Sequence, residues 1–148
     1  MNLDLYTPEY FMNEAMKQAE LAYEDEEIPV GAVVVSGNRI IARAYNQVER
    51  LGDPTAHAEM IAITSATQYL GSKYLEGCSL YVTLEPCPMC AGALFWSQID
   101  QLVFGADDPK RGFRLHSTSL LHSRTKLSHG IMAEESRKLL GLFFERIR

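Results

Sequence analysis

The pattern of hydrophobic and polar positions predicts that short helices and strands alternate along this chain. Apolar residues first recur three or four positions apart, and Thr7 followed by Pro8 is typical of a helix start. The acidic run at residues 24–27 and Pro29 then end this first helix. Further along, β-branched runs of strand length alternate with segments of helical period. The predicted helices cover about residues 8–24, 57–68, 88–97 and 134–147, and the predicted strands residues 30–35, 39–45, 80–84, 101–104 and 126–132.

Turn-forming and polar residues separate these segments. Residues 47–54, 71–77 and 107–123 are predicted to be loops, the last with about one helical turn. The order of elements predicts an α/β fold, in which a mixed five-stranded sheet is covered by helices on both faces. No repeat or linker interrupts the chain, so residues 1–148 are predicted to form one domain. In the last helix, four apolar residues are predicted to share one face: Leu139, Leu140, Phe143 and Ile147.

Length and composition support one globular domain. The chain has 148 residues, of which 47% are hydrophobic and 22% charged, which excludes a disordered chain. The longest apolar runs, residues 30–35 and 90–96, fall far below the about 18 residues of a membrane span, so no membrane partner is expected. The start, Met1-Asn2-Leu3-Asp4, lacks the features of a signal peptide. The three cysteines are an odd number, and no export signal precedes them, so their thiols are predicted to stay reduced. We therefore predict a cytoplasmic protein.

The net charge of -5 conceals an uneven distribution. Residues 1–109 carry 5 Lys+Arg and 16 Asp+Glu, whereas residues 110–148 carry 9 Lys+Arg and 3 Asp+Glu. Such asymmetry indicates an anionic partner, most commonly a nucleic acid. A solvated basic face on the last helix would give the same pattern, so charge alone leaves both interpretations open.

Two cysteines stand three residues apart at a predicted helix start. Pro88 disfavours the helical conformation for Cys87, which places Cys87 at the helix cap and Cys90 in the first turn, on the same face. The free N–H groups and the dipole of a helix N-terminus favour thiolates. Converging thiolates are typical zinc ligands, with Zn–S distances of about 2.3 Å.

Two residues upstream complete a candidate zinc site. His57 is the candidate third ligand. Helix positions two apart point about 200° away from one another, so Glu59 shares the site only if His57 stands at the helix entrance. This geometry favours Glu59 reaching a water on the metal over binding the metal itself. Cys78 is predicted to be a buried thiol about 20 Å or more from Cys87, at the opposite end of a strand.

Three protein ligands leave one position for water, which is typical of a catalytic zinc site rather than a structural one. Zinc lowers the pKa of its water toward about 7, and Glu59 can pass the water's proton to a leaving amine. The predicted chemistry is hydrolytic deamination. A structural zinc module would not explain Glu59 or the missing fourth ligand, and a thioredoxin-like redox motif would not explain His57.

His57-Ala58-Glu59 together with Pro86-Cys87-Pro88-Met89-Cys90 resembles the H-x-E…P-C-x-x-C signature of zinc-dependent nucleobase deaminases. More narrowly, the chain is similar to bacterial tRNA-specific adenosine deaminases, which convert the wobble adenosine of an anticodon to inosine. The resemblance covers residues 8–112 closely and the last helix more loosely. Its other matching stretches are Pro29-Val30-Gly31-Ala32-Val33, Asn46, Asp53-Pro54-Thr55-Ala56, Tyr81-Val82-Thr83-Leu84-Glu85, Ala91-Gly92-Ala93 and Val103-Phe104-Gly105-Ala106.

The resemblance implies a three-layer α/β/α cytidine-deaminase-like fold, a homodimer, and a tRNA anticodon loop as partner. It implies one Zn²⁺ per subunit, held by His57, Cys87 and Cys90, with Glu59 as the proton shuttle. It also implies four substrate-binding residues: Asn46 hydrogen-bonding the base, Val30 and Leu84 lining its pocket, and Asp108 in a loop that touches the nucleotide backbone.

The match weakens after Gly112. Family members often carry small residues there and an Asn-His pair further on, whereas this chain has Phe113-Arg114-Leu115-His116-Ser117 and Leu127-Ser128-His129-Gly130. These departures fall where the family grips its RNA, so a deaminase of a free base or nucleoside (guanine, cytosine or adenosine) stays the alternative. The basic C-terminal part favours tRNA, since a free base does not need it. Without metal-ligand neighbours, three histidines are predicted to be surface or loop residues: His116, His122 and His129.

Overall fold

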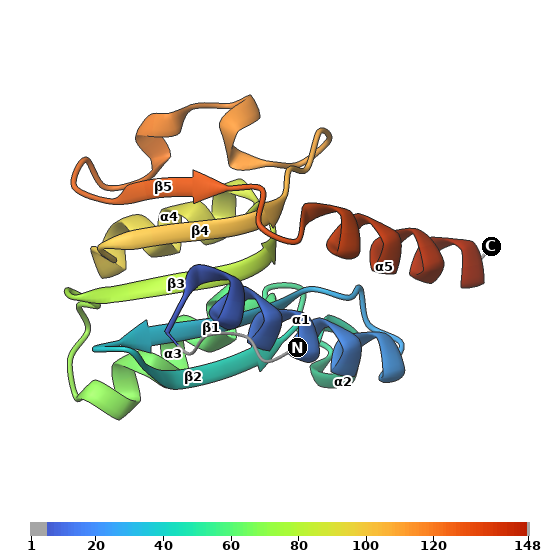
Figure 1. Cartoon of the computed structure of the whole chain (residues 1–148), viewed down its shortest axis with the longest axis horizontal. Helices are drawn as coiled ribbons and strands as arrows, with labels where there is room; N and C mark the ends of the chain where they lie inside the picture. The colour runs from blue at the N-terminus through green and yellow to red at the C-terminus, as the bar shows by residue number, and fades with distance from the viewer. Residues whose placement is uncertain (1–5, 148) are drawn as a thin grey trace.

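Five strands form one mixed sheet in the computed structural model, in the order β2-β1-β3-β4-β5 (Figure 1). The structure describes residues 6–147, so the prediction drawn from residues 1–4 lies outside the described residues. Strand β1 pairs antiparallel with β2 and β3, whereas β4 runs parallel to β3 and β5. The predicted mixed five-stranded sheet is confirmed. The strands are β1 (Gly31–Ser36), β2 (Arg39–Tyr45), β3 (Cys78–Leu84), β4 (Gln101–Ala106) and β5 (Lys126–His129).

Helices cover both faces of this sheet. Helices α1 (Pro8–Glu24) and α5 (Ala133–Arg146) pack on one face, and α3 (Ala58–Leu70) and α4 (Pro88–Ser97) on the other (Figure 1). The predicted three-layer α/β/α arrangement is therefore confirmed. Among residues 6–147, no helix combines the length and the apolar character needed to cross a membrane.

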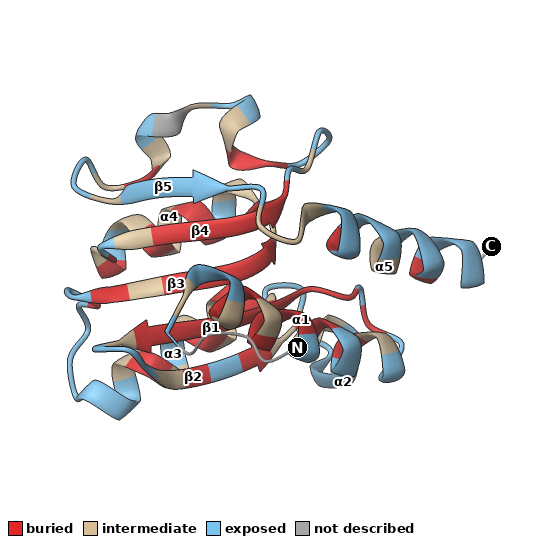
Figure 2. Ribbon diagram, viewed as in Figure 1, coloured by how far each residue is buried: buried red, intermediate tan, exposed pale blue. Residues whose placement is uncertain are grey.

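The central strands are buried because each of their faces meets a helix layer. Successive residues of a strand point to opposite faces, so Val33 packs toward α1 while Ala32 and Val34 pack toward α3 and α4. Strand β5 at the sheet edge differs, since all of its residues are exposed (Figure 2). The core is thus centred on β1, β3 and β4.

The structure corrects several predicted boundaries. The predicted loop at residues 47–54 contains a one-turn helix, α2 (Val48–Leu51), and residues 107–123 contain two 3-10 turns, η1 (Phe113–Leu115) and η2 (Thr118–Leu120). The last strand ends at His129 instead of residue 132. Of the four apolar residues predicted to share one face of the last helix, Phe143 is buried, whereas Ile147 lies past the end of α5 at Arg146 and is 61% exposed.

Candidate active site

The N-termini of α3 and α4 meet at one end of the sheet. His57 is the N-cap residue of α3 and Cys87 the N-cap residue of α4, both with extended backbone. Pro88 occupies the first position of α4, and Cys90 lies in its first turn. The positions predicted from Pro88 and from the three-residue spacing are confirmed.

Three side chains converge at this point. The Nδ1 atom of His57 lies 3.6 Å from the Sγ atom of Cys87 and 3.5 Å from that of Cys90. The three ligand atoms all lie within 4.8 Å of one another. Tetrahedral ligands at ordinary zinc bond lengths stand about 3.5 to 4 Å apart, so this donor set fits a zinc ion. Cys78, the buried first residue of β3, is not part of the cluster, as predicted.

The two sulfurs differ in pKa because they share a hydrogen bond. The pKa of Cys87 is lowered to about 4, mainly because the Cys90 thiol donates a hydrogen bond to its sulfur. The pKa of Cys90 is raised, first by this hydrogen bond and then by burial. A hydrogen bond with Cys87 raises the pKa of His57 as well. Cys87 is therefore a thiolate and Cys90 a thiol, and a metal ion bound by both would displace the proton of Cys90.

Glu59 lies at the second position of α3 and is 4% exposed. Interaction with the Glu59 carboxyl group contributes to the raised pKa of Cys90, so Glu59 shares the site, as the position of His57 at the helix entrance predicted. Burial raises the pKa of Glu59 to about 7. A carboxyl group with this pKa can both accept and release a proton near neutral pH, which suits a general acid and base.

A tight turn sets the position of His57. The carboxylate of Asp53 accepts hydrogen bonds of 2.8 Å from both the backbone N–H and the hydroxyl of Thr55. These bonds, the backbone one first, hold the pKa of Asp53 below its usual value. The backbone N–H of Gln47 donates to the carbonyl of Ala56 at 3.0 Å. The turn is thereby tied to the end of β2 before α3 begins.

The residues predicted to contact substrate have distinct surroundings. Asn46 is buried and its backbone N–H donates to the carbonyl of Val30 at 3.1 Å, but its side-chain amide makes no hydrogen bond within residues 6–147. Val30 and Leu84 pack in the hydrophobic core shared with α3 and α4. Asp108 is half-buried, and one of its carboxylate oxygens accepts the backbone N–H groups of the next turn. Their contacts with substrate stay predictions.

Sequence reasoning missed the role of Glu85, which is 4% exposed. Its carboxylate accepts hydrogen bonds from the backbone N–H of Asp108 at 3.0 Å and from that of Arg114 at 3.0 Å. The Arg114 guanidinium donates two more at 3.3 Å each. One signal was present, a carboxylate two residues before Cys87, but its partners follow 23 and 29 residues later.

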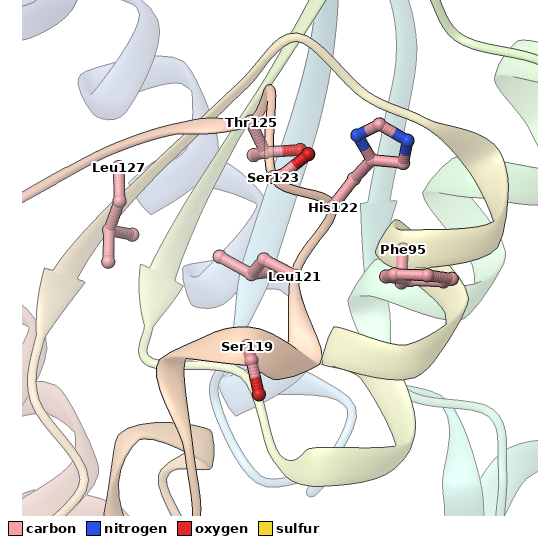
Figure 3. A pocket seen from close by; sticks show the side chains of 7 residues that line it. All are labelled: Phe95, Ser119, Leu121, His122, Ser123, Thr125 and Leu127. Atoms are coloured by element: carbon pink, nitrogen blue, oxygen red, sulfur yellow. The ribbon is translucent and has the colours of Figure 1, made fainter.

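A cavity of about 470 Å³ lies apart from the cluster, between α4 and residues 119–127 (Figure 3). The side chains that line it are those of Phe95, Ser119, Leu121, His122, Ser123, Thr125 and Leu127. It includes no residue predicted to bind metal or substrate. His122 lines it and is half-buried, while His116 and His129 are exposed, so the predicted surface location of the three histidines is confirmed.

Comparisons with known proteins agree with this geometry. Residues 5–106 match the family described as the cytidine and deoxycytidylate deaminase zinc-binding region. The tRNA-specific adenosine deaminase of Aquifex aeolicus is 47% identical over 145 residues, which covers 95% of both proteins. That of Bacillus subtilis is 44% identical over 145 residues, covering 95% of this chain and 90% of the relative.

Solved structures show the same likeness. A structure from work on A-to-I editing by tRNA:A34 deaminases superimposes with a TM-score of 0.82 at 40% identity, covering 88% of this chain and 98% of the other. A guanine deaminase from Bacillus subtilis superimposes with a TM-score of 0.64 at 39% identity, covering 72% of this chain and 66% of the other.

Proposed function

Because this chain belongs to the cytidine and deoxycytidylate deaminase family, we propose that it hydrolytically deaminates adenosine to inosine at the wobble position of a tRNA anticodon. The observation that carries the proposal is the extent of the identity to tRNA-specific adenosine deaminases. That identity covers 95% of the chain, so it continues past residue 106 into the basic C-terminal part. The likeness to the guanine deaminase of Bacillus subtilis covers 72% of the chain, and that to a guanine deaminase of Nitrosomonas europaea covers 93% at only 23% identity, which is a likeness of fold alone.

His57, Cys87 and Cys90 are proposed to hold one zinc ion per subunit, and Glu59 to move protons. A zinc ion held by these three residues would lower the pKa of a water molecule and so supply the nucleophile. Glu59 would accept a proton from the attacking water and deliver it to the exocyclic amine, while the second proton of the water ends on N1 of inosine. A C–O bond forms at C6 of adenine, the C6–N bond breaks, and ammonia leaves. Burial of Glu59 suits this task, because its pKa of about 7 lets it release the proton that it has accepted.

Three further residues are proposed to hold the base. The side-chain amide of Asn46, which has no hydrogen bond within the described part of the chain, is free to pair with the edge of a flipped-out adenine. Val30 and Leu84 are proposed to line its pocket with apolar surface. Asp108 is proposed to contact the nucleotide backbone through the carboxylate oxygen that its own turn leaves free.

Part of the C-terminal positive charge is available for phosphate. The exposed side chains of Lys110 and Arg111 form no ion pair with any residue between 6 and 147, whereas Arg137 pairs with Asp107. Lys110 and Arg111 follow Asp108, whose backbone is bonded to Glu85 near the metal-binding helix. Unpaired cations beside the site support an RNA substrate over a free base.

The outer face of α4 supports a homodimer. Trp96 is 76% exposed and Met89 37% exposed, whereas the buried residues of this helix are Cys90, Ala91, Leu94 and Ser97. Gly92 lies between Met89 and Trp96 in the sequence, and a Cβ atom there would meet nothing within 4 Å. Exposed aromatic and Met side chains on an apolar face are typical of protein interfaces.

A tRNA substrate and three free cysteines support a cytoplasmic location.

The proposed reaction is tested with an anticodon stem-loop that carries adenosine at the wobble position. We expect inosine at that position by mass spectrometry, and no product from a matched stem-loop with guanosine there. Free guanine, cytosine and adenosine are assayed in parallel, because the likeness to a guanine deaminase supports a free base as the second candidate. Turnover of a free base without turnover of the stem-loop would replace the proposed function by that candidate.

A further inference from the structure

Residues 107–114 form a loop that is fastened to the segment just before the metal-binding helix. Glu85 accepts the backbone N–H groups of Asp108 and Arg114, one near each end of the loop, at 3.0 Å each. The backbone N–H of Phe113 donates to the carbonyl of Pro86 at 2.9 Å. Since Cys87 follows directly, the path of the loop is set relative to the candidate metal ligands.

The Arg114 side chain strengthens this attachment. Its Nε and Nη2 atoms donate to the two oxygens of Glu85 at 3.3 Å each, and the side chain is only 30% exposed. Two parallel bonds between a guanidinium and a carboxylate fix geometry as well as adding energy. The third nitrogen, Nη1, lies 3.2 Å from Nε2 of His129 on β5. Arg114 therefore joins the loop to the sheet edge.

The side chains of Arg114 and His129 both pack against the ring of Phe104 on β4. The His129 ring is stacked on the Phe104 ring, with centroids 5.0 Å apart and planes 10° apart. The guanidinium carbon of Arg114 lies 4.9 Å from the centroid of the same ring. Arg114 and His129 belong to the two stretches in which this chain departs from the deaminase pattern. These departures contact each other, so they form one structural unit.

Between its fastened ends the loop presents two free cations. The carboxylate of Asp108 accepts the backbone N–H groups of Lys110 and Arg111 at 3.1 and 3.0 Å, so their backbone is fixed while their side chains stay exposed. We infer that Glu85 and Arg114 are positioning residues, which hold Lys110 and Arg111 where they bind phosphates of the RNA substrate. This inference rests on the proposed function.

The test compares the Arg114→Ala variant with a matched Arg43→Ala control, both as zinc-loaded proteins. Arg43 also pairs with a buried carboxylate, Glu14, at 2.6 Å through one nitrogen, but on β2 and α1, away from the loop. We expect Arg114→Ala to raise the KM for the stem-loop about tenfold while kcat changes less than about twofold, because the loop loses its position but the metal centre is kept. Zinc content is expected to be unchanged, and Arg43→Ala is expected to keep the KM of the unsubstituted protein.

Salt dependence gives a readout that a general loss of stability would not move. If Lys110 and Arg111 no longer contact phosphates of the RNA in Arg114→Ala, the slope of log(1/KM) against log[salt] becomes shallower by about 1 to 2. Arg114→Lys keeps the charge but not the two parallel bonds, so its KM is expected between those of the other two proteins. If Arg114→Ala does not fold, Arg114→Lys decides the question by the same two measurements.

An unchanged KM and salt slope in these variants, with an active unsubstituted protein, would overturn the inference and leave the proposed function intact. Loss of zinc or of kcat at unchanged KM would also overturn it, because Arg114 would then support the metal centre instead of the RNA contact. An unsubstituted protein that does not deaminate the stem-loop would reject the proposed function itself.

Discussion

Gly112 lies so close to Glu85 that a Cβ atom at position 112 would overlap the Glu85 carboxylate. Four hydrogen bonds hold this carboxylate in place, so it cannot turn aside. Only glycine, which has no Cβ atom, can occupy position 112 without overlapping this carboxylate. The first prediction follows from this contact.

Gly112→Ala is expected to lower the free energy of unfolding by about 1 to 3 kcal/mol, the usual effect of overpacking, measured by urea denaturation. Gly141→Ala is the control, because a Cβ atom at Gly141 in α5 meets nothing within 4 Å. That control is expected to be neutral, or more stable by up to about 1 kcal/mol from helix propensity. Equal stability of the two variants would contradict the observed packing.

Glu59→Gln is expected to keep zinc but lose activity by about 10²- to 10⁴-fold, because the amide cannot move protons. Zinc is measured by mass spectrometry of the purified protein and activity by inosine formation. Stoichiometric loss of zinc in this variant would show that Glu59 binds the metal, against the role proposed for it.

Cys90→Ser is expected to lose zinc and, with it, stability, because metal binding is coupled to folding. Cys78→Ala is the matched control: Cys78 is equally buried but lies at the other end of β3, so its variant is expected to keep one zinc per chain. The measurements are zinc content and the urea midpoint. A Cys90→Ser protein that is stable and fully loaded with zinc would contradict the ligand assignment.

The candidate metal site could be predicted from the sequence because its geometry is local. Pro88 determines the conformation of Cys87, and a spacing of three residues brings Cys90 to the same helix face. The position of His57 at a helix entrance likewise determines where Glu59 can point. Each of these relationships spans at most three residues. The approach of His57 to Cys87 and Cys90 spans 30 and 33 residues, and it was predicted from the resemblance to the H-x-E…P-C-x-x-C signature.

The remaining features depend on contacts between distant segments, which periodicity does not show. The short helix α2 forms because buried Glu27 accepts the backbone N–H groups of Glu49 and Arg50, at 3.0 and 2.7 Å, from 22 and 23 residues away. The pairing of Glu85 with Arg114 spans 29 residues in the same way. Both carboxylates were visible in the sequence, but their partners became visible only with the topology.

Trp96→Glu is expected to shift the protein from dimer to monomer, because a charge would replace the most exposed apolar side chain of α4. The measurement is sedimentation velocity over a range of protein concentrations. Leu142→Glu is the control, since Leu142 is 47% exposed on α5, on the opposite side of the sheet. Dissociation in the control alone would place the interface on α5.

The Glu14 carboxylate on α1 predicts a pH-dependent part of the stability. Burial alone raises its pKa, but hydrogen bonds from Lys17 at 2.7 Å and Arg43 at 2.6 Å outweigh burial, and its pKa lies below the usual 4.5. The folded carboxyl group therefore binds its proton less readily than the unfolded one. The resulting stabilisation is present above pH 4.5 and is lost as the pH falls through the lowered pKa.

Glu14→Gln is accordingly expected to lower the free energy of unfolding by about 1 kcal/mol at neutral pH, since both cations are largely exposed and screened by solvent. The difference from the unsubstituted protein should shrink as the pH falls below 4.5, which urea denaturation at a series of pH values measures. Glu20→Gln serves as the control, because Glu20 is exposed on the same helix and forms no ion pair with any described residue. If the difference in free energy of unfolding between Glu14→Gln and the unsubstituted protein stays the same in acid, Glu14 stabilises the fold by packing and not by its paired charge.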